Sequence, residues 1–191
     1  MMPVTAGKAD MVKVLAFTGS RPKSLYGGHD RKAWSLLCAR IEHAVTALQD
    51  EWGIGEAWSG GAQGADMACF AAIARHNRRH ADKRILNMVA VPFPGQERMW
   101  PEEGMFGAAS YRRMIADADE TITVSVKGSR QAYMRRNMFM VFRSDLLLAV
   151  SRADPSTAKT GTGSTVRRAM SLGRPVFWLE ADSGSMSRLN P

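Results

Sequence analysis

Three glycine-rich segments of the sequence combine bare backbone with hydroxyls and single charges, a mixture that suits anion binding. They read SGGAQGAD at residues 59–66, TGSRP at residues 18–22 and TGTGST at residues 160–165. The first and the last each run into a predicted helix, whose N-terminus carries about half a positive charge and free N–H groups. Glycines there let a phosphate or a flat base approach the backbone closely. Two such helix starts on one sheet predict an anion site between them.

Individual residues in these segments suggest roles in holding a ligand. Gly19 and Ser20 expose backbone N–H groups, and Arg21 offers a planar set of donors for phosphate or carboxylate. Arg21 has an equally simple interpretation as a surface residue of a turn. Asp66 either stabilises the start of its helix through the helix dipole or accepts a hydrogen bond from a ribose hydroxyl.

Two candidate residues lie outside the glycine-rich segments. Glu97 belongs to VPFPGQERMWP, where Gln96 and Trp100 could join it in bonding and stacking on a base. The simpler interpretation of the indole, which we favour slightly, is that it covers the sheet edge. Asn137 is either a hydrogen-bonded core residue or a group that faces the site. The complete set of candidate ligand-binding residues is Gly19, Ser20, Arg21, Gly60, Gly61, Gln63, Asp66, Glu97, Asn137, Gly161, Gly163, Ser164 and Thr165.

Apolar runs alternate with helical patterns along the chain, and this order sets the expected fold. The pattern predicts βαβ units, which build a doubly wound, Rossmann-like α/β layer with a mostly parallel sheet of about six strands and helices on both faces. In such sheets ligands bind at the carboxyl ends of the strands. The predicted strands are 12–18, 56–59, 85–91, 121–126, 145–150 and 175–180, and the predicted helices 30–48, 65–79, 108–116, 131–142 and 165–172.

The composition favours a single cytoplasmic domain with an anionic partner. The chain has 191 residues and a net charge of +8, and no apolar run is long enough to cross a membrane. We expect a disordered lead-in over residues 1–11, one domain over residues 12–182 and a flexible tail over residues 183–191. The two cysteines show no metal spacing, and the four histidines lack convincing partners, so we expect no metal site.

Taken in order, five motifs resemble the SLOG superfamily, with the YpsA-like and YspA-like proteins of bacteria and phages as the most similar branches. The motifs are GSRP, GGAQGAD, PFPGQERMW, RNMFMVFRSDLLLAV and GTGST. The resemblance covers about residues 12–179, nearly the whole chain. It implies a Rossmann-like SLOG domain that binds a nucleotide or nucleotide-derived ligand, as a sensor or sequestering protein. The residues that it would bring to the ligand are Gly19, Ser20, Arg21, Gly60, Gly61, Asp66, Gly161, Gly163, Ser164 and Thr165.

One departure from the resemblance separates binding from catalysis. The LOG phosphoribohydrolases of this superfamily carry a catalytic glutamate after their last glycine-rich motif, whereas Arg167 and Arg168 follow GTGSTV here. Glycosidic cleavage needs a carboxylate. We therefore expect ligand binding without catalysis and without a cofactor. If the chain is instead a nucleotide N-glycosidase or phosphoribohydrolase, Glu97 or Asp66 would supply the carboxylate.

The partners expected beside the small molecule are a second copy of the chain and nucleic acid. Relatives in the SLOG superfamily often pair, and thirteen methionines offer adaptable contact surfaces. DprA, another relative, binds single-stranded DNA. The net charge of +8 keeps single-stranded nucleic-acid binding open as a third hypothesis.

Overall fold

A computed structural model describes residues 12–27 and 29–189, which form one seven-stranded sheet. The strand order is β4-β3-β2-β1-β5-β6-β7. The neighbours from β4 to β6 pair in parallel, and β7 pairs antiparallel with β6. The strands are β1 (Lys13–Gly19), β2 (Ile54–Ser59), β3 (Leu86–Val91), β4 (Glu120–Thr123), β5 (Leu146–Ser151), β6 (Val176–Glu180) and β7 (Met186–Leu189).

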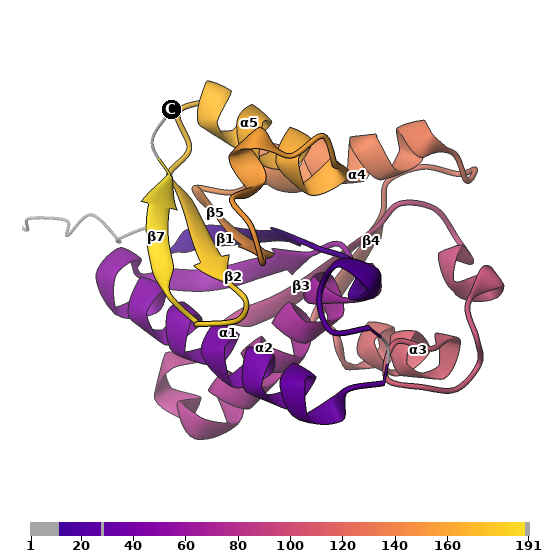
Figure 1. Cartoon of the computed structure of the whole chain (residues 1–191), viewed down its shortest axis with the longest axis horizontal. Coiled ribbons are helices and arrows are strands. Elements are labelled where there is room, and N and C mark those ends of the chain that lie inside the picture. The colour runs from indigo at the N-terminus through magenta and orange to yellow at the C-terminus, as the bar shows by residue number, and fades with distance from the viewer. Residues whose placement is uncertain (1–11, 28, 190–191) are drawn as a thin grey trace, which may run out of the picture.

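Helices cover both faces of this sheet, which confirms the predicted doubly wound, Rossmann-like fold. In Figure 1 the helices α1, α2 and α3 lie on one face, and α4 and α5 lie on the other. Their bounds are α1 (Arg31–Trp52), α2 (Ala65–Arg79), α3 (Ala108–Asp117), α4 (Arg130–Arg143) and α5 (Gly161–Ser171).

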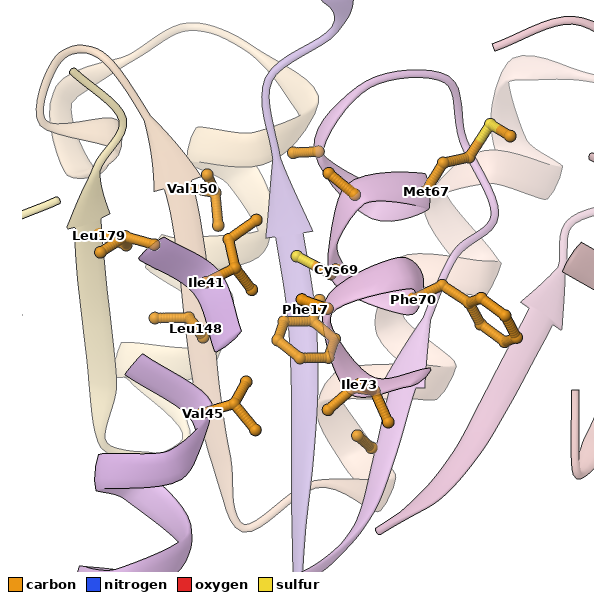
Figure 2. Close-up of a cluster of buried hydrophobic side chains, with 14 of the residues drawn as sticks. Phe17, Ile41, Val45, Met67, Cys69, Phe70, Ile73, Leu148, Val150 and Leu179 are labelled. Carbon is orange, nitrogen blue, oxygen red and sulfur yellow. The ribbon is translucent and has the colours of Figure 1, made fainter. Parts of the chain in front are cut away.

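The strands place alternate side chains in two separate cores. Phe17 and Leu148 pack under α1 and α2, whereas Ala16 and Leu147 belong to the smaller cluster under α4 and α5. Figure 2 shows the first core, in which Phe17, Leu148 and Ile41 gather between the sheet and the two helices. Since both faces of the central strands are buried, β5 is apolar along nearly its whole length.

The long first helix follows its sequence signals closely. The Asp30 carboxylate accepts a hydrogen bond from the Ala33 N–H at 2.9 Å and so caps the N-terminus, as predicted. The apolar stripe that includes Trp34, Ile41 and Leu48 is buried. The helix runs a turn further than expected, to Trp52, where Gly53 ends it with a φ of 69°.

The carboxyl end of the chain differs from the expected tail. Met186–Leu189 form β7 on the sheet edge, within the segment for which the sequence predicted a flexible tail. The Glu180 carboxylate holds the preceding turn, because it accepts from the N–H groups of Asp182 and Ser183 at 2.9 and 2.6 Å. This short turn folds the chain back on β6. Residues 1–11, the expected lead-in, lie outside the described residues.

The winding direction of the chain reverses at β1. The chain passes from β1 outward to β4 and then crosses back to β5 on the other side of β1. Gly19 and Val150 are partners at the carboxyl ends of β1 and β5. A reversal of this kind leaves a crevice at the strand ends, because the loops that follow the two strands turn toward opposite faces of the sheet.

The packing of α2 on β1 predicts a stability difference between two glycines. A Cβ on Gly19 would overlap the Cβ of Ala65 and lie 2.7 Å from the Val150 carbonyl oxygen, whereas a Cβ on Gly161 would meet nothing within 4 Å. Thermal unfolding should therefore show Gly19→Ala destabilised by about 1–3 kcal/mol. Gly161→Ala should be as stable as the parent, and equal melting temperatures of the two variants would contradict this packing.

Candidate functional site

A cavity of about 210 Å³ lies at the carboxyl end of β1, the strand at which the strand order reverses. We call it the strand-end pocket. Its wall comes from the end of β1 and the loop after it, the start of α2, the middle of α4 and the start of α5. The lining residues are Phe17, Thr18, Gly19, Ser20, Arg21, Ser24, Ala62, Asp66, Tyr133, Arg136, Asn137, Met140, Thr160, Gly161 and Thr162.

A buried ion pair forms one side of the strand-end pocket. Arg136 on α4 donates from Nη1 to Asp66 Oδ2 on α2 at 3.2 Å, and the two side chains are 5% and 8% exposed. The same carboxylate oxygen accepts from the Ala62 N–H at 3.3 Å. Among the described residues, the Nε of Arg136 has no hydrogen-bond partner. The pair thus leaves one covered donor of this guanidinium without a partner, in a residue that lines the cavity.

The charge balance around this guanidinium is positive. Burial lowers the pKa of Arg136, the Asp66 carboxylate opposes that shift, and the nearby Arg21 lowers the pKa further. An arginine keeps its proton at neutral pH in spite of such shifts. Two arginines and one carboxylate therefore line the pocket, a balance that an anion would complete.

Gly60 does not line the pocket but leaves the space that the ion pair of Arg136 and Asp66 needs. A Cβ on Gly60 would overlap the guanidinium of Arg136 and lie 2.7 Å from Asp66 Oδ2. Any larger side chain at this position would push the two charged groups apart. The glycine at the end of β2 is therefore explained by the ion pair behind it.

The start of α5 supplies the second wall. Thr160 caps the helix by accepting from the Gly163 N–H at 3.1 Å, so α5 begins at Gly161, four residues earlier than predicted. The N–H groups of Gly161 and Thr162 have no partner within the helix, since they belong to its first turn. The Thr162 hydroxyl donates to the Gly19 carbonyl at 2.8 Å and ties α5 to the end of β1.

This earlier start changes the expected roles of three residues. Gly163 lies inside the helix, and a Cβ there would overlap the Ala158 carbonyl oxygen, so the glycine permits close packing on the preceding turn. Thr165 is fully buried and accepts a hydrogen bond from Asn137 Nδ2 at 2.9 Å. Ser164 is exposed. Thr165 therefore orients the pocket residue Asn137 from behind.

The start of α2 is less open than its sequence suggests. The Ala65 N–H donates to the Ser20 carbonyl at 3.1 Å, and Gly64 adopts a φ of 96° directly against that carbonyl. Gln63 Nε2 donates to the Phe106 carbonyl at 2.7 Å, and Gly61 packs near Tyr111. The loop after β1 thus covers the N–H at the helix start, and α2 contributes Asp66 to the pocket instead.

Six of the predicted ligand residues line the strand-end pocket, and the others do not. The six are Gly19, Ser20, Arg21, Asp66, Asn137 and Gly161. Glu97 lies in the short helix Gln96–Met99, outside the pocket wall. Burial of Tyr111, aided by the charge of Glu97, raises the pKa of Tyr111 to about 12. The residues not brought to the pocket are Gly60, Gly61, Gln63, Glu97, Gly163, Ser164 and Thr165.

Sequence reasoning missed Arg136, although a signal for it exists. Ala132, Arg136 and Met140 recur every four residues and are all buried on α4. An arginine on the buried side of a helix requires a partner, and an acid at the start of α2 meets that requirement. Tyr133, one turn before Asn137, was also missed and lines the same pocket.

The described ranges 12–27 and 29–189 contain no group of three histidine, cysteine or acidic side chains that could hold a metal ion. Within the same ranges, the helices are all too short or too polar to cross a membrane.

The buried pair predicts an asymmetric response to substitution. Arg136→Met would leave the Asp66 carboxylate buried without its counter-ion, so the free energy of unfolding should fall by about 3–5 kcal/mol. The double variant Arg136→Met, Asp66→Asn should lose less than the sum of the two single variants. Arg152→Met, which breaks an exposed pair with Asp182, is the matched control and should cost less than about 1 kcal/mol in denaturant unfolding. Equal losses for Arg136→Met and Arg152→Met would contradict the assignment.

Comparison with known proteins identifies a relative, a solved structure with a similar fold and a matching family. The chain is 28% identical over 138 residues to the uncharacterized SPbeta prophage-derived protein YoqJ of Bacillus subtilis (strain 168), which covers 65% of this chain and 75% of that protein. A solved structure of DNA processing protein A from Helicobacter pylori, described for its single-stranded DNA binding mode, matches with a TM-score of 0.53.

That structural match is 15% identical and covers 87% of this chain but only 64% of the Helicobacter chain, so it shows a shared fold. A family model described as YpsA, the YspA SLOG family, matches residues 15–174. These residues begin within β1 and include the reversal at the strand ends and all five α-helices. The chain therefore belongs to the YspA SLOG family.

Proposed function

We propose that the chain binds the phosphorylated part of a nucleotide-derived ligand in the strand-end pocket. The observation that carries the proposal is the buried guanidinium of Arg136, which lines this pocket with its Nε unpaired among the described residues. A buried guanidinium that is held by a single carboxylate contact and lines a cavity favours a ligand that supplies further acceptors. Phosphate oxygens are suitable acceptors for a guanidinium.

The surrounding groups support an anion at the same place. Arg21 adds a second guanidinium from the loop after β1, and Asp66 neutralises one of the two positive charges. The N-terminus of α5 adds partial positive charge and the N–H groups of Gly161 and Thr162. The pocket therefore offers charge and directed donors from three separate elements.

The size of the pocket favours partial burial of the ligand. Its volume of about 210 Å³ is below the roughly 300–1,000 Å³ of sites that enclose a drug-sized ligand. A phosphate with part of its sugar fits this space, and the base would lie at the mouth. Tyr133 lines the pocket and packs edge-to-face with Phe93, with ring centroids 5.3 Å apart, and offers a flat face for a base.

The positions of the candidate carboxylates favour ligand binding without cleavage over catalysis. Asp66 already accepts from Arg136 and from the Ala62 N–H, so its carboxylate is committed to structure. Glu97 does not line the pocket. Hydrolysis of a glycosidic bond needs a carboxylate at the sugar, and both candidates for that role are placed unfavourably.

Calorimetry with AMP, ADP and ADP-ribose on the full chain tests the phosphate site. Arg21 is exposed, so Arg21→Ala should keep the fold and lower the affinity about tenfold to a hundredfold, the value of a lost hydrogen bond to a charged group. Lys23→Ala removes an exposed cation two residues away that does not line the pocket, and serves as the control. Adenosine, which lacks phosphate, should not bind measurably. Equal binding of adenosine and AMP, or equal effects of the two variants, would refute the proposal.

Single-stranded nucleic acid is the second candidate ligand. The Helicobacter protein with the same fold is described for its binding of single-stranded DNA, and the net charge of +8 here favours a polyanion. The same pocket would then hold one phosphate of the strand.

A labelled oligonucleotide distinguishes the two candidates. If single-stranded nucleic acid is the ligand, the anisotropy of the oligonucleotide should rise when the protein is added and fall again with added salt. Its affinity should be reduced more by Arg21→Ala than by Lys23→Ala. Retention of the oligonucleotide in the presence of saturating AMP would show that nucleic acid binds elsewhere. Absence of binding at low salt would remove this candidate.

A further inference from the structure

A second and larger cavity lies away from the strand ends, on the face of the sheet that carries α1, α2 and α3. Its volume is about 690 Å³, and it shares no lining residue with the strand-end pocket. We call it the helical groove. Its lining residues are Arg31, Trp34, Ser35, Cys38, Met67, Ala68, Phe70, Ala71, Ala74, Arg75, Arg78, Gly104, Met105, Phe106, Ser110, Arg113, Met114 and Asp117.

The floor of the helical groove is apolar and follows α2. Figure 2 shows Met67 and Phe70 pointing from α2 to the side away from Ile41, and both side chains are buried. Ala71 is exposed and Ala74 is half-buried, so the middle of the groove is lined by small side chains. These alanines leave room for another backbone to approach α2 closely.

The rim of the groove is strongly basic. Arg31, Arg78 and Arg113 are exposed, and none of them forms an ion pair within the described part of the chain. Arg75 is paired with Glu42 at 3.1 Å, and Asp117 is the single acid of the lining. Three unpaired arginines and one unpaired aspartate therefore surround an apolar floor, so the rim is positive on balance.

We infer that the helical groove docks an acidic amphipathic helix of a partner protein. From Met67 to Arg78, α2 borders the groove over eleven residue steps, about 16 Å or three helical turns. An apolar strip three turns long between charged walls is the surface that an amphipathic helix recognises. The arginines select glutamate and aspartate on the flanks of that helix. A second copy of the chain is a poorer occupant, because each copy carries a net charge of +8.

Fluorescence anisotropy with labelled helical peptides of about 14 residues tests this inference on the full chain. The peptides carry leucine on one face in several registers, flanked by glutamates in one set and by lysines in a matched set. The glutamate set should bind and the lysine set should not. Arg78→Glu should weaken binding about tenfold. Arg188→Glu, which reverses an exposed arginine on β7 outside the groove, should leave binding unchanged.

Ala71→Arg distinguishes docking in the groove from simple charge attraction as the cause of peptide binding. This substitution adds positive charge but fills the middle of the groove, so docking predicts weaker binding of the glutamate peptides, whereas simple charge attraction predicts tighter binding. The inference is overturned if no glutamate peptide binds, if Arg188→Glu weakens binding as much as Arg78→Glu, or if a single-stranded oligonucleotide displaces the bound peptide. It is also overturned if sedimentation shows a dimer of the unmodified chain that Ala71→Arg dissociates, since a second copy would then be the occupant.

Discussion

The buried ion pair between Arg136 and Asp66 is the constraint on which the strand-end pocket depends. It joins α4 on one face of the sheet to the start of α2 on the other, across the carboxyl end of β2. Burial of both charges is tolerable only because each is paired, and because Gly60 leaves room for the guanidinium. The pair also fixes the charge of the cavity. With Asp66 neutralising one arginine, the remaining positive charge is available to an anion.

The helix α2 links this pocket to the rest of the molecule. Its first residues meet the loop after β1, its inner side packs on the sheet, and its outer side borders the helical groove. Alanines and Gly19 let it approach β1 closely enough for the Ser20 carbonyl to cap its first N–H group. A single short helix thus separates a small cationic pocket from a larger groove with a basic rim, and the two surfaces suit different partners.

The fold was predictable from the sequence because its signals are local. Apolar strands, the Asp30 cap and the alternation of elements each depend on neighbouring residues, and the structure confirms the doubly wound sheet. The site was predictable only in part. The glycine-rich loops pointed to the edge of the sheet where the strand-end pocket lies, but Gly60 and Gly163 are required for close packing. The four-residue spacing on α4 marks Arg136 as buried, but its partner is an acid 70 positions away that no local pattern identifies. The strand β7 likewise depends on a turn held by Glu180.

A phosphate group beside Arg136 is the core of the proposed function, and a crystal structure of the chain with bound AMP tests it most directly. Phosphate oxygens should lie within hydrogen-bond distance of the Arg136 and Arg21 guanidinium groups and of the first N–H groups of α5. The base should lie toward Tyr133 at the mouth of the pocket. An AMP phosphate bound elsewhere on the chain, with the strand-end pocket free of ligand, would contradict the central claim.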